Sequence, residues 1–220
     1  MDSIVGQSRH QLILDACAGS GCESIYLRKK GLPVISNEID LQLLSVAQRA
    51  AQAEGVTLSC SAVDWRELGT EFGEEKFTTA LLMGNSLGLM EEPTEIRRVL
   101  REVLQVLRPG GHFVVDQRNY DYILNEREEI LSGRFRYSRK FIYCGRRITG
   151  RPIAIEDDRV EFGYFGEDNV RIGVLSMIPL REKSLNSMLL DAGFKDVERL
   201  YDFSKRQCTD YDFITYVATK

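Results

Sequence analysis

The chain has 220 residues, of which 43% are hydrophobic and 28% charged, and its net charge is −4. This length suits one large α/β domain, and the slightly acidic balance argues against a general attraction to nucleic acid or to anionic membranes. No apolar run approaches the roughly 18 residues that a membrane span needs. The N-terminus also lacks the apolar stretch of a signal peptide. We therefore expect a globular cytoplasmic protein.

The cysteines and histidines indicate neither a disulfide framework nor a metal site. Five cysteines are present, an odd number, and no two have C-x-x-C spacing. That pattern is typical of free thiols in a reducing compartment. Neither of the two histidines lies in a cluster with the spacing of zinc ligands. We expect no metal.

The first half of the chain alternates strand and helix patterns. Helices are predicted at 21–31, 41–55 and 93–111, where Pro109-Gly110-Gly111 ends the last of them. Short apolar runs predict the strands, at 12–16, 32–40, 56–64, 78–84 and 112–117. Such a βαβαβ rhythm implies a parallel sheet covered by helices on both faces.

The second half is richer in β patterns. Runs separated by turn residues predict antiparallel hairpins, at 135–144, 151–155, 159–165 and 170–178. A helix over 179–194 and strands at 195–203 and 212–220 follow. We predict an α/β, Rossmann-like fold in a single domain, 1–220, with a small β-rich insertion on the substrate side at 135–180.

A glycine-bearing turn follows the first predicted strand and opens a helix. Gly19 and Gly21 let the backbone approach a ligand, and Glu38 ends the next strand 17 residues after Gly21. Ligands of such sheets bind beyond the carboxyl ends of the strands. A dinucleotide fingerprint would have a third glycine where Ser24 stands, which argues against NAD. The remaining alternative is that the glycines merely turn the chain.

The pattern Asp15-x-x-x-Gly19-x-Gly21, with an acid after the second strand, resembles class I S-adenosylmethionine-dependent methyltransferases. Asp64 and Trp65 follow the third strand, where an acid could meet the adenine amino group and an indole could cover the ring. An ordinary half-buried aromatic is the alternative for Trp65. Met83 ends the fourth strand beside the expected sulfonium. Asn85 follows it, where a plain turn residue is the alternative.

Two longer motifs narrow the resemblance. Gly84-Asn-Ser-Leu87 and Asp116-Gln-Arg-Asn-Tyr-Asp-Tyr-Ile-Leu124 are similar to the glycine N-methyltransferase group, which includes the glycine/sarcosine methyltransferases of betaine synthesis. Further segments match in order as far as Phe213-Ile-Thr-Tyr-Val217, so that the resemblance covers nearly the whole chain. It implies that methyl groups pass from S-adenosylmethionine to the nitrogen of a small amino acid or amine, such as glycine or sarcosine.

The resemblance also implies roles for individual residues. Arg118 would grip the substrate carboxylate with its planar fork, Asn85 would accept a hydrogen bond from the amine, and Tyr164 would face the same substrate. The alternative for Arg118 is a surface or ion-pair residue near Asp116 or Asp121. The residues that would bind the cofactor are Asp15, Cys17, Gly19, Gly21, Glu38, Asp64, Trp65 and Met83. No general base is evident.

Two features leave other interpretations open. The family carries a long N-terminal segment that folds over the cofactor, whereas about eleven residues precede the first strand here. We therefore expect a pocket open on one side, and a non-catalytic relative that only binds the cofactor remains an alternative. Residues 134–151 interleave seven Lys or Arg with aromatic residues. That pattern fits either a methyltransferase of nucleic acid or a half-buried strand with one solvated face.

Overall fold

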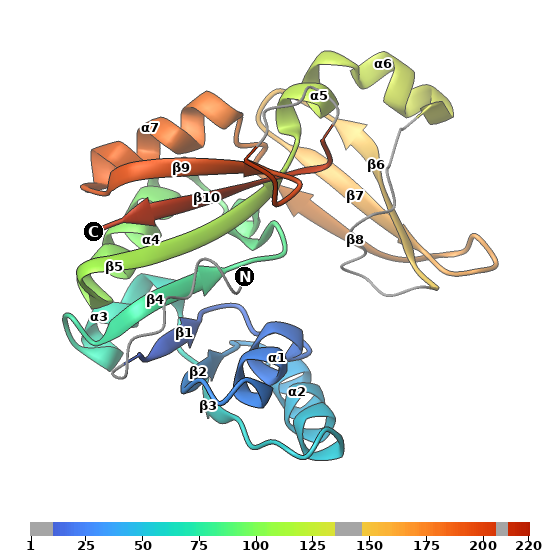
Figure 1. The fold of residues 1–220 in the computed structure, drawn as a ribbon. Coiled ribbons are helices and arrows are strands. Elements are labelled where there is room, and N and C mark those ends of the chain that lie inside the picture. The colour runs from blue at the N-terminus through green and yellow to red at the C-terminus, as the bar shows by residue number, and fades with distance from the viewer. Residues whose placement is uncertain (1–10, 135–146, 206–210) are drawn as a thin grey trace.

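The structure, a computed structural model, describes residues 11–134, 147–205 and 211–220, which form two β-sheets and the helices around them (Figure 1). The larger sheet has seven strands in the order β3-β2-β1-β4-β5-β10-β9. These strands are β1 (Ile13–Asp15), β2 (Val34–Asn37), β3 (Ser59–Ser61), β4 (Phe77–Leu82), β5 (Leu107–Arg118), β9 (Lys195–Tyr201) and β10 (Phe213–Thr219). The smaller sheet has the order β6-β7-β8 and contains β6 (Thr149–Ile155), β7 (Val160–Phe165) and β8 (Arg171–Met177).

Strands β1 to β5 are parallel, while β10 runs antiparallel to both of its neighbours. The chain moves outward from β1 to β3 and then returns to place β4 on the other side of β1. We call the region beyond the carboxyl ends of β1 and β4 at this reversal the crevice, because ligands bind there in sheets of this kind.

Helices cover both faces of the large sheet, because successive side chains of each strand point to opposite faces and both faces are apolar. The helices are α1 (Cys22–Lys29), α2 (Leu41–Ala53), α3 (Leu68–Phe72), α4 (Pro93–Val106), α5 (Tyr120–Asn125), α6 (Arg127–Glu129) and α7 (Glu182–Ala192). Leu14 and Val115 face the core shared with α4 and α7, whereas Ile13 and Val114 face the opposite core, which includes Leu27 of α1. The period of two along each strand produces this division.

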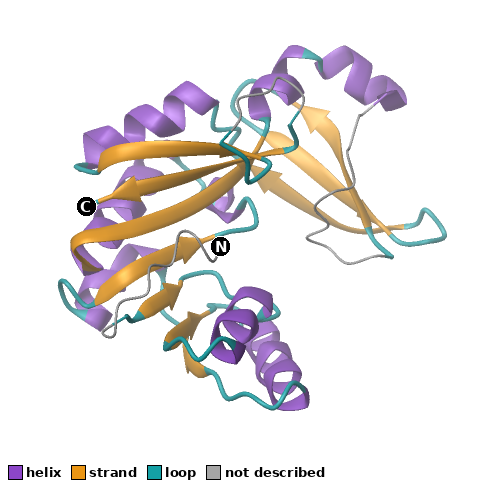
Figure 2. Ribbon diagram, in the orientation of Figure 1, coloured by secondary structure: helices purple, strands orange, loops and turns teal. Residues whose placement is uncertain are grey.

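The smaller sheet is attached to the larger one at the end of β5, as Figure 2 shows. Residues of α5 pack against β6 and β7, including Tyr120 and Ile123 against Ile155 and Phe162. The residue after β8, Ile178, donates its backbone N–H to the carbonyl of Gly88 at 2.7 Å. Gly88 belongs to a short 3₁₀ turn, Ser86–Leu89, that follows β4. The two sheets therefore meet beside the crevice.

The predicted fold class is confirmed, with shifts at element ends. Helix α4 ends at Val106 rather than near Pro109, because Leu107 already pairs with Phe77 as part of β5. The three hairpin strands are found as β6, β7 and β8, while the predicted run 135–144 lies outside the described residues. Helices α3, α5 and α6 were not predicted. Among the described residues, no helix is long and apolar enough to cross a membrane.

Candidate active site

The glycine turn after β1 adopts the conformation that its sequence requires. Gly19 and Gly21 have φ angles of +52° and +89°, which L side chains rarely adopt. A Cβ atom on Gly21 would lie 2.9 Å from the Cβ of Ala47, so this glycine also allows α1 to pack closely on α2. Near Gly19 the space is open, since the nearest atom to an added Cβ is 4.0 Å away. The turn therefore has room for a ligand beside its backbone.

Glu38 lies against this turn from the end of β2. Its Oε2 accepts a hydrogen bond from the backbone N–H of Gly19 at 2.9 Å, and its Oε1 accepts one from the N–H of Asp40 at 2.9 Å. The side chain is half-buried, and an ionised carboxylate has about four acceptor positions, of which these two bonds use half. The remaining lone pairs suit the two hydroxyl groups of a ribose.

Asp15 is buried beneath the turn, and its side chain does not face the crevice. Its carboxylate is 1% exposed and accepts a hydrogen bond from the hydroxyl of Ser24 at 2.6 Å, which in turn accepts one from Ser36 at 2.8 Å. Burial raises the pKa of Asp15 to about 7. Ser24, which replaces the third glycine of a dinucleotide site, is thus a partner of Asp15. This chain of three side chains fixes the base of the turn.

A buried amide that the sequence analysis did not single out joins the ends of three strands. Asn37 donates its side-chain N–H to the carbonyls of Ala16 and Val63, at 3.2 and 2.9 Å, and accepts from the N–H of Val63 at 2.8 Å. The indole N–H of Trp65 donates to the same carbonyl of Ala16 at 2.7 Å. The indole is therefore held at the glycine turn, in the region expected for the adenine ring.

Asp64, which was predicted to meet the adenine amino group, pairs with an arginine of its own turn. Its two oxygens accept hydrogen bonds from the guanidinium of Arg66 at 2.9 and 2.6 Å, and Arg66 also pairs with Glu95 at 2.6 Å. These bonds lower the pKa of the Asp64 carboxyl. An adenine amino group that donated to Asp64 would have to share this carboxylate with Arg66.

Cys17 and Met83 link the ends of β1 and β4. The Cys17 thiol donates to the Met83 carbonyl at 3.1 Å, and the Met83 N–H donates back to the sulfur at 3.0 Å. Burial raises the pKa of the Cys17 thiol well above its ordinary value, so it stays protonated at neutral pH. The pair joins the ends of the two strands at the switch point of the sheet.

Asn85 connects four elements at the end of β4. It has a left-handed conformation with φ of +62°, and its backbone N–H donates to Asp116 at 2.7 Å. Its side-chain oxygen accepts from the backbone N–H of Arg118 at 3.0 Å, and its amide group donates to the hydroxyl of Tyr120 at 2.9 Å and to the sulfur of Met177 at 2.8 Å. Asn85 is thus more than a turn residue, and its oxygen keeps one acceptor position.

A cavity of about 330 Å³ opens next to Asn85. It brings together the three residues predicted to face the substrate, since Asn85, Arg118 and Tyr164 all line it. The remaining lining comes from Leu43, Gly84, Ser86, Leu175, Met177 and Phe213. Arg118 is only 7% exposed, which rules out a surface role. The cavity is therefore apolar, with one buried guanidinium among a few polar groups.

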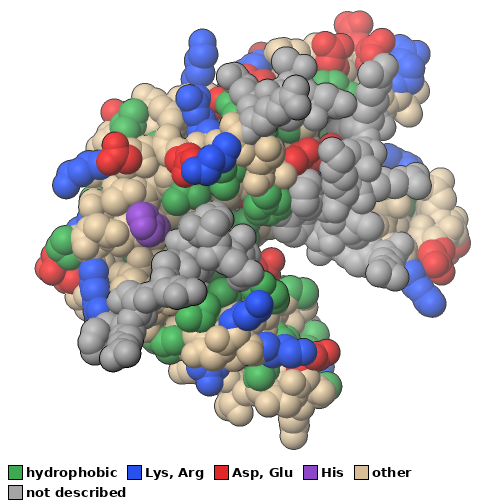
Figure 3. All heavy atoms as spheres, in the orientation of Figure 1, with side chains coloured by type: hydrophobic (Ala, Val, Ile, Leu, Met, Phe, Trp, Pro, Cys, Tyr) green, Lys and Arg blue, Asp and Glu red, His purple; other side chains and the backbone are tan. Residues whose placement is uncertain are grey.

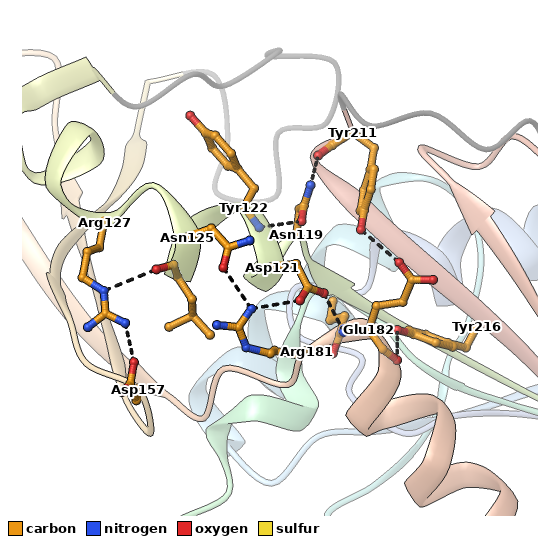
Figure 4. Close-up of polar contacts among 12 residues, drawn as sticks. Asn119, Asp121, Tyr122, Asn125, Arg127, Asp157, Arg181, Glu182, Tyr211 and Tyr216 are labelled. Carbon is orange, nitrogen blue, oxygen red and sulfur yellow. Dashed lines mark hydrogen bonds and ion pairs between the residues drawn. The ribbon is translucent and has the colours of Figure 1, made fainter.

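Asp121 belongs to a separate polar cluster, drawn in Figure 4. Its carboxylate accepts from the guanidinium of Arg181 at 3.0 Å and from the backbone N–H of Glu182 at 2.9 Å. The carboxylate of Glu182 accepts from the hydroxyls of Tyr201 and Tyr211, at 2.9 and 3.3 Å. This cluster fastens α5 to the start of α7.

In the part of the chain that the structure describes, no group of His, Cys, Asp and Glu could hold a metal ion.

The comparisons with known proteins agree with this geometry. A family model described as a methyltransferase domain matches residues 13–111. The glycine/sarcosine N-methyltransferase of Aphanothece halophytica is 31% identical over 94% of this chain and 76% of its own length, and that of Halorhodospira halochloris is 29% identical over 94% and 75%. A crystal structure of an S-adenosylmethionine-dependent methyltransferase from Clostridium acetobutylicum superposes with a TM-score of 0.75 at 18% identity, covering 99% of this chain and 85% of that one.

The fold and the crevice thus define a class I methyltransferase, an enzyme that uses S-adenosylmethionine. More narrowly, the chain belongs to the family of N-methyltransferases that includes the glycine/sarcosine N-methyltransferases. The glycine turn and Glu38 suit this cofactor, and the NAD alternative falls away.

Proposed function

We propose that this enzyme methylates the nitrogen of a small amino acid, such as glycine or sarcosine. The observation that carries the proposal is the buried guanidinium of Arg118 in a cavity shared with Asn85 and Tyr164. A carboxylate is the natural partner of such a group, because guanidinium and carboxylate match in geometry and charge. The two relatives named above are glycine/sarcosine N-methyltransferases, which supports the same substrate class.

The cofactor would occupy the crevice beyond β1 and β4. Glu38 would accept from the ribose hydroxyls, Gly19 and Gly21 would let the backbone approach, and Trp65 would cover the adenine. Asp15 would act indirectly by holding the turn. Cys17 and Met83 would form the wall near the reacting end, and Asp64 would approach the adenine only in competition with Arg66. When bound, S-adenosylmethionine supplies a methyl group that is already activated by its positive sulfur.

The protein's own contribution would be placement. Arg118 would hold the carboxylate, and the free acceptor position of Asn85 would select the amine in its neutral form and direct it. Tyr164 would close the other side of the cavity. Such fixed geometry can contribute roughly 7–11 kcal/mol to a reaction between two bound partners. A strong general base is not needed if the amine loses its proton on binding.

We also propose a cytoplasmic location, a single domain and a small-molecule partner for this enzyme. The unpaired thiols of Cys17, Cys22 and Cys60 suit a reducing cytoplasm. The hydrogen bond between Gly88 and Ile178 and the packing of α5 suit a single domain. On the face drawn in Figure 3, acidic and basic side chains are interspersed, which suits a small-molecule partner better than nucleic acid. The basic run at 135–146 lies outside the described residues.

Methyl transfer from labelled S-adenosylmethionine to glycine and sarcosine tests the proposal. Replacing Arg118 by Ala should cost about 3–5 kcal/mol of kcat/KM, because a buried carboxylate would lose its partner. Arg118→Lys should also fail, since a point charge cannot replace the planar fork. Cofactor affinity should hardly change in either variant. Full turnover in Arg118→Ala would end the amino acid proposal, and joint loss of cofactor binding would assign Arg118 to the fold instead.

A further inference from the structure

Two aromatic rings flank the guanidinium of Arg118. Its central carbon lies 4.8 Å from the ring centre of Phe162 and 5.0 Å from that of Phe213, over each ring. Both rings are almost completely buried, at 0% and 1% exposure. Arg118 therefore contacts two aromatic rings, in an environment from which water is largely excluded.

The two rings come from different sheets. Phe213 begins β10 and is the direct cross-strand partner of Arg118 on β5. Phe162 lies on β7 of the small sheet, two residues before Tyr164, which lines the cavity. The guanidinium thus lies where the large sheet and the small sheet meet, beside the cavity. Its position depends on how the two sheets meet.

Aromatic faces attract a cation through the ring quadrupole, and the attraction grows when water is excluded. Rings on the guanidinium also restrict the rotamers of a long and flexible side chain, which would otherwise have to be ordered when a ligand binds. The rings are weak hydrogen-bond acceptors, so they do not compete with a carboxylate for the guanidinium.

We propose that Phe162 and Phe213 are positioning residues that hold the Arg118 guanidinium in the orientation that receives the substrate carboxylate. This inference rests on the proposed function, because it assumes that Arg118 binds the carboxylate. It assigns the small sheet a part in substrate binding, through a ring that is itself buried away from the substrate.

The first test replaces each ring with a branched aliphatic side chain. Phe162→Leu and Phe213→Leu should each raise KM for glycine about tenfold, the scale of a desolvated cation–π contact. The kcat and the dissociation constant of S-adenosylhomocysteine should change less than about twofold, because neither ring is among the residues proposed to bind the cofactor. Phe213→Tyr keeps the ring, so its KM should stay close to that of the unmodified enzyme.

Phe165→Leu is the matched control. It makes the same substitution on the same strand, and its ring packs on a different arginine, Arg151, at 3.8 Å. This variant should leave KM unchanged. An equal rise in KM for Phe165→Leu, or an unchanged KM in both Phe162→Leu and Phe213→Leu, would overturn the positioning role.

A double-substitution cycle separates positioning from general loosening. In an Arg118→Lys background, Phe162→Leu should lower kcat/KM less than about twofold further, because the fork that the ring holds is already gone. A full tenfold further loss would show that Phe162 acts elsewhere, and would overturn the inference. Absence of glycine and sarcosine turnover in the unmodified enzyme would instead overturn the proposed function, and the positioning role with it.

Discussion

Glu38 illustrates how a single carboxylate serves both the fold and the proposed cofactor site. It accepts from two backbone N–H groups and keeps acceptor positions toward the crevice. Glu38→Ala should weaken S-adenosylhomocysteine binding by about 1–3 kcal/mol, the scale for hydrogen bonds to a charged acceptor. Calorimetry measures the effect directly.

The control for this variant is Glu54→Ala. Glu54 is an exposed carboxylate that pairs with Lys29 on the surface of the same lobe. Its removal changes the net charge equally but takes away no group of the crevice, so cofactor affinity should stay as it is. If Glu38→Ala also binds with unchanged affinity, Glu38 does not contact the cofactor.

Asp15 should make the stability of the enzyme depend on pH. Its pKa is about 7 in the folded protein, against 3.8 for an unperturbed aspartate. Between these values the folded protein keeps a proton that the unfolded chain has released. The contribution of Asp15 to the free energy of unfolding is therefore fully present below about pH 4 and is lost as the pH rises through 7. The loss amounts to roughly 4 kcal/mol in all.

Asp15→Asn removes this titration, so its free energy of unfolding should fall much less between pH 5 and pH 8. Urea unfolding at the two pH values measures the difference. Glu54→Gln provides the control: pairing with Lys29 lowers the pKa of Glu54, so it does not titrate in this range. An unmodified slope in Asp15→Asn would mean that another group is responsible.

At the scale of single residues, sequence motifs suggested which residues form the site but could not predict the partners of those residues. The three residues predicted to face the substrate, Asn85, Arg118 and Tyr164, do line one cavity. The Arg66 contact of Asp64 and the buried position of Asp15 depend on rotamers and on neighbours from other elements. Phe162 and Asn37 escaped notice because isolated aromatic or amide residues carry no spacing signal.

At the scale of elements, the periodic pattern predicted the succession of strands and helices along the chain but not every boundary. Periodicity identifies α4 well, yet its end is set by the pairing of Leu107 with Phe77, a contact between distant residues. Helices such as α3 and α5 are too short for a periodic pattern to appear. Tertiary contacts decide both features.

The joint between the two sheets makes a prediction of its own. A Cβ on Gly88 would lie 2.9 Å from the carbonyl oxygen of Ile178, so a side chain there must push the backbone apart. Gly88→Ala should destabilise the protein by about 1–3 kcal/mol. It should also reduce methyl transfer more than cofactor binding, because the joint places β7 and β8 beside the cavity.

Gly173→Ala is the control for this joint. Gly173 lies on β8 of the same small sheet, and an added Cβ would meet nothing within 4 Å. Chemical denaturation and turnover should both be close to those of the unmodified enzyme. Equal losses in the two variants would show that the small sheet tolerates no added methyl group, and the joint would have no special part.

At the scale of the whole molecule, the two ends of the site should respond separately to ligands. The turn with Glu38 belongs to the large sheet, whereas the cavity with Arg118 lies where the two sheets meet. S-adenosylhomocysteine at 100 times its dissociation constant should raise the free energy of unfolding by about 2.7 kcal/mol, because it binds only the folded state. NAD at the same concentration should give no increase.

Arg118→Ala and Glu38→Ala should differ in how much S-adenosylhomocysteine stabilises them. In Arg118→Ala the stabilisation by S-adenosylhomocysteine should persist, since the guanidinium faces the substrate cavity. In Glu38→Ala at the same ligand concentration it should fall to about 0.3–1.7 kcal/mol, because a loss of about 1–3 kcal/mol in binding weakens the ligand's hold on the folded state. Thermal unfolding of the three proteins with and without ligand checks both statements. Equal stabilisation of the two variants would mean that the cofactor spans the site differently, with Arg118 and Glu38 contributing alike.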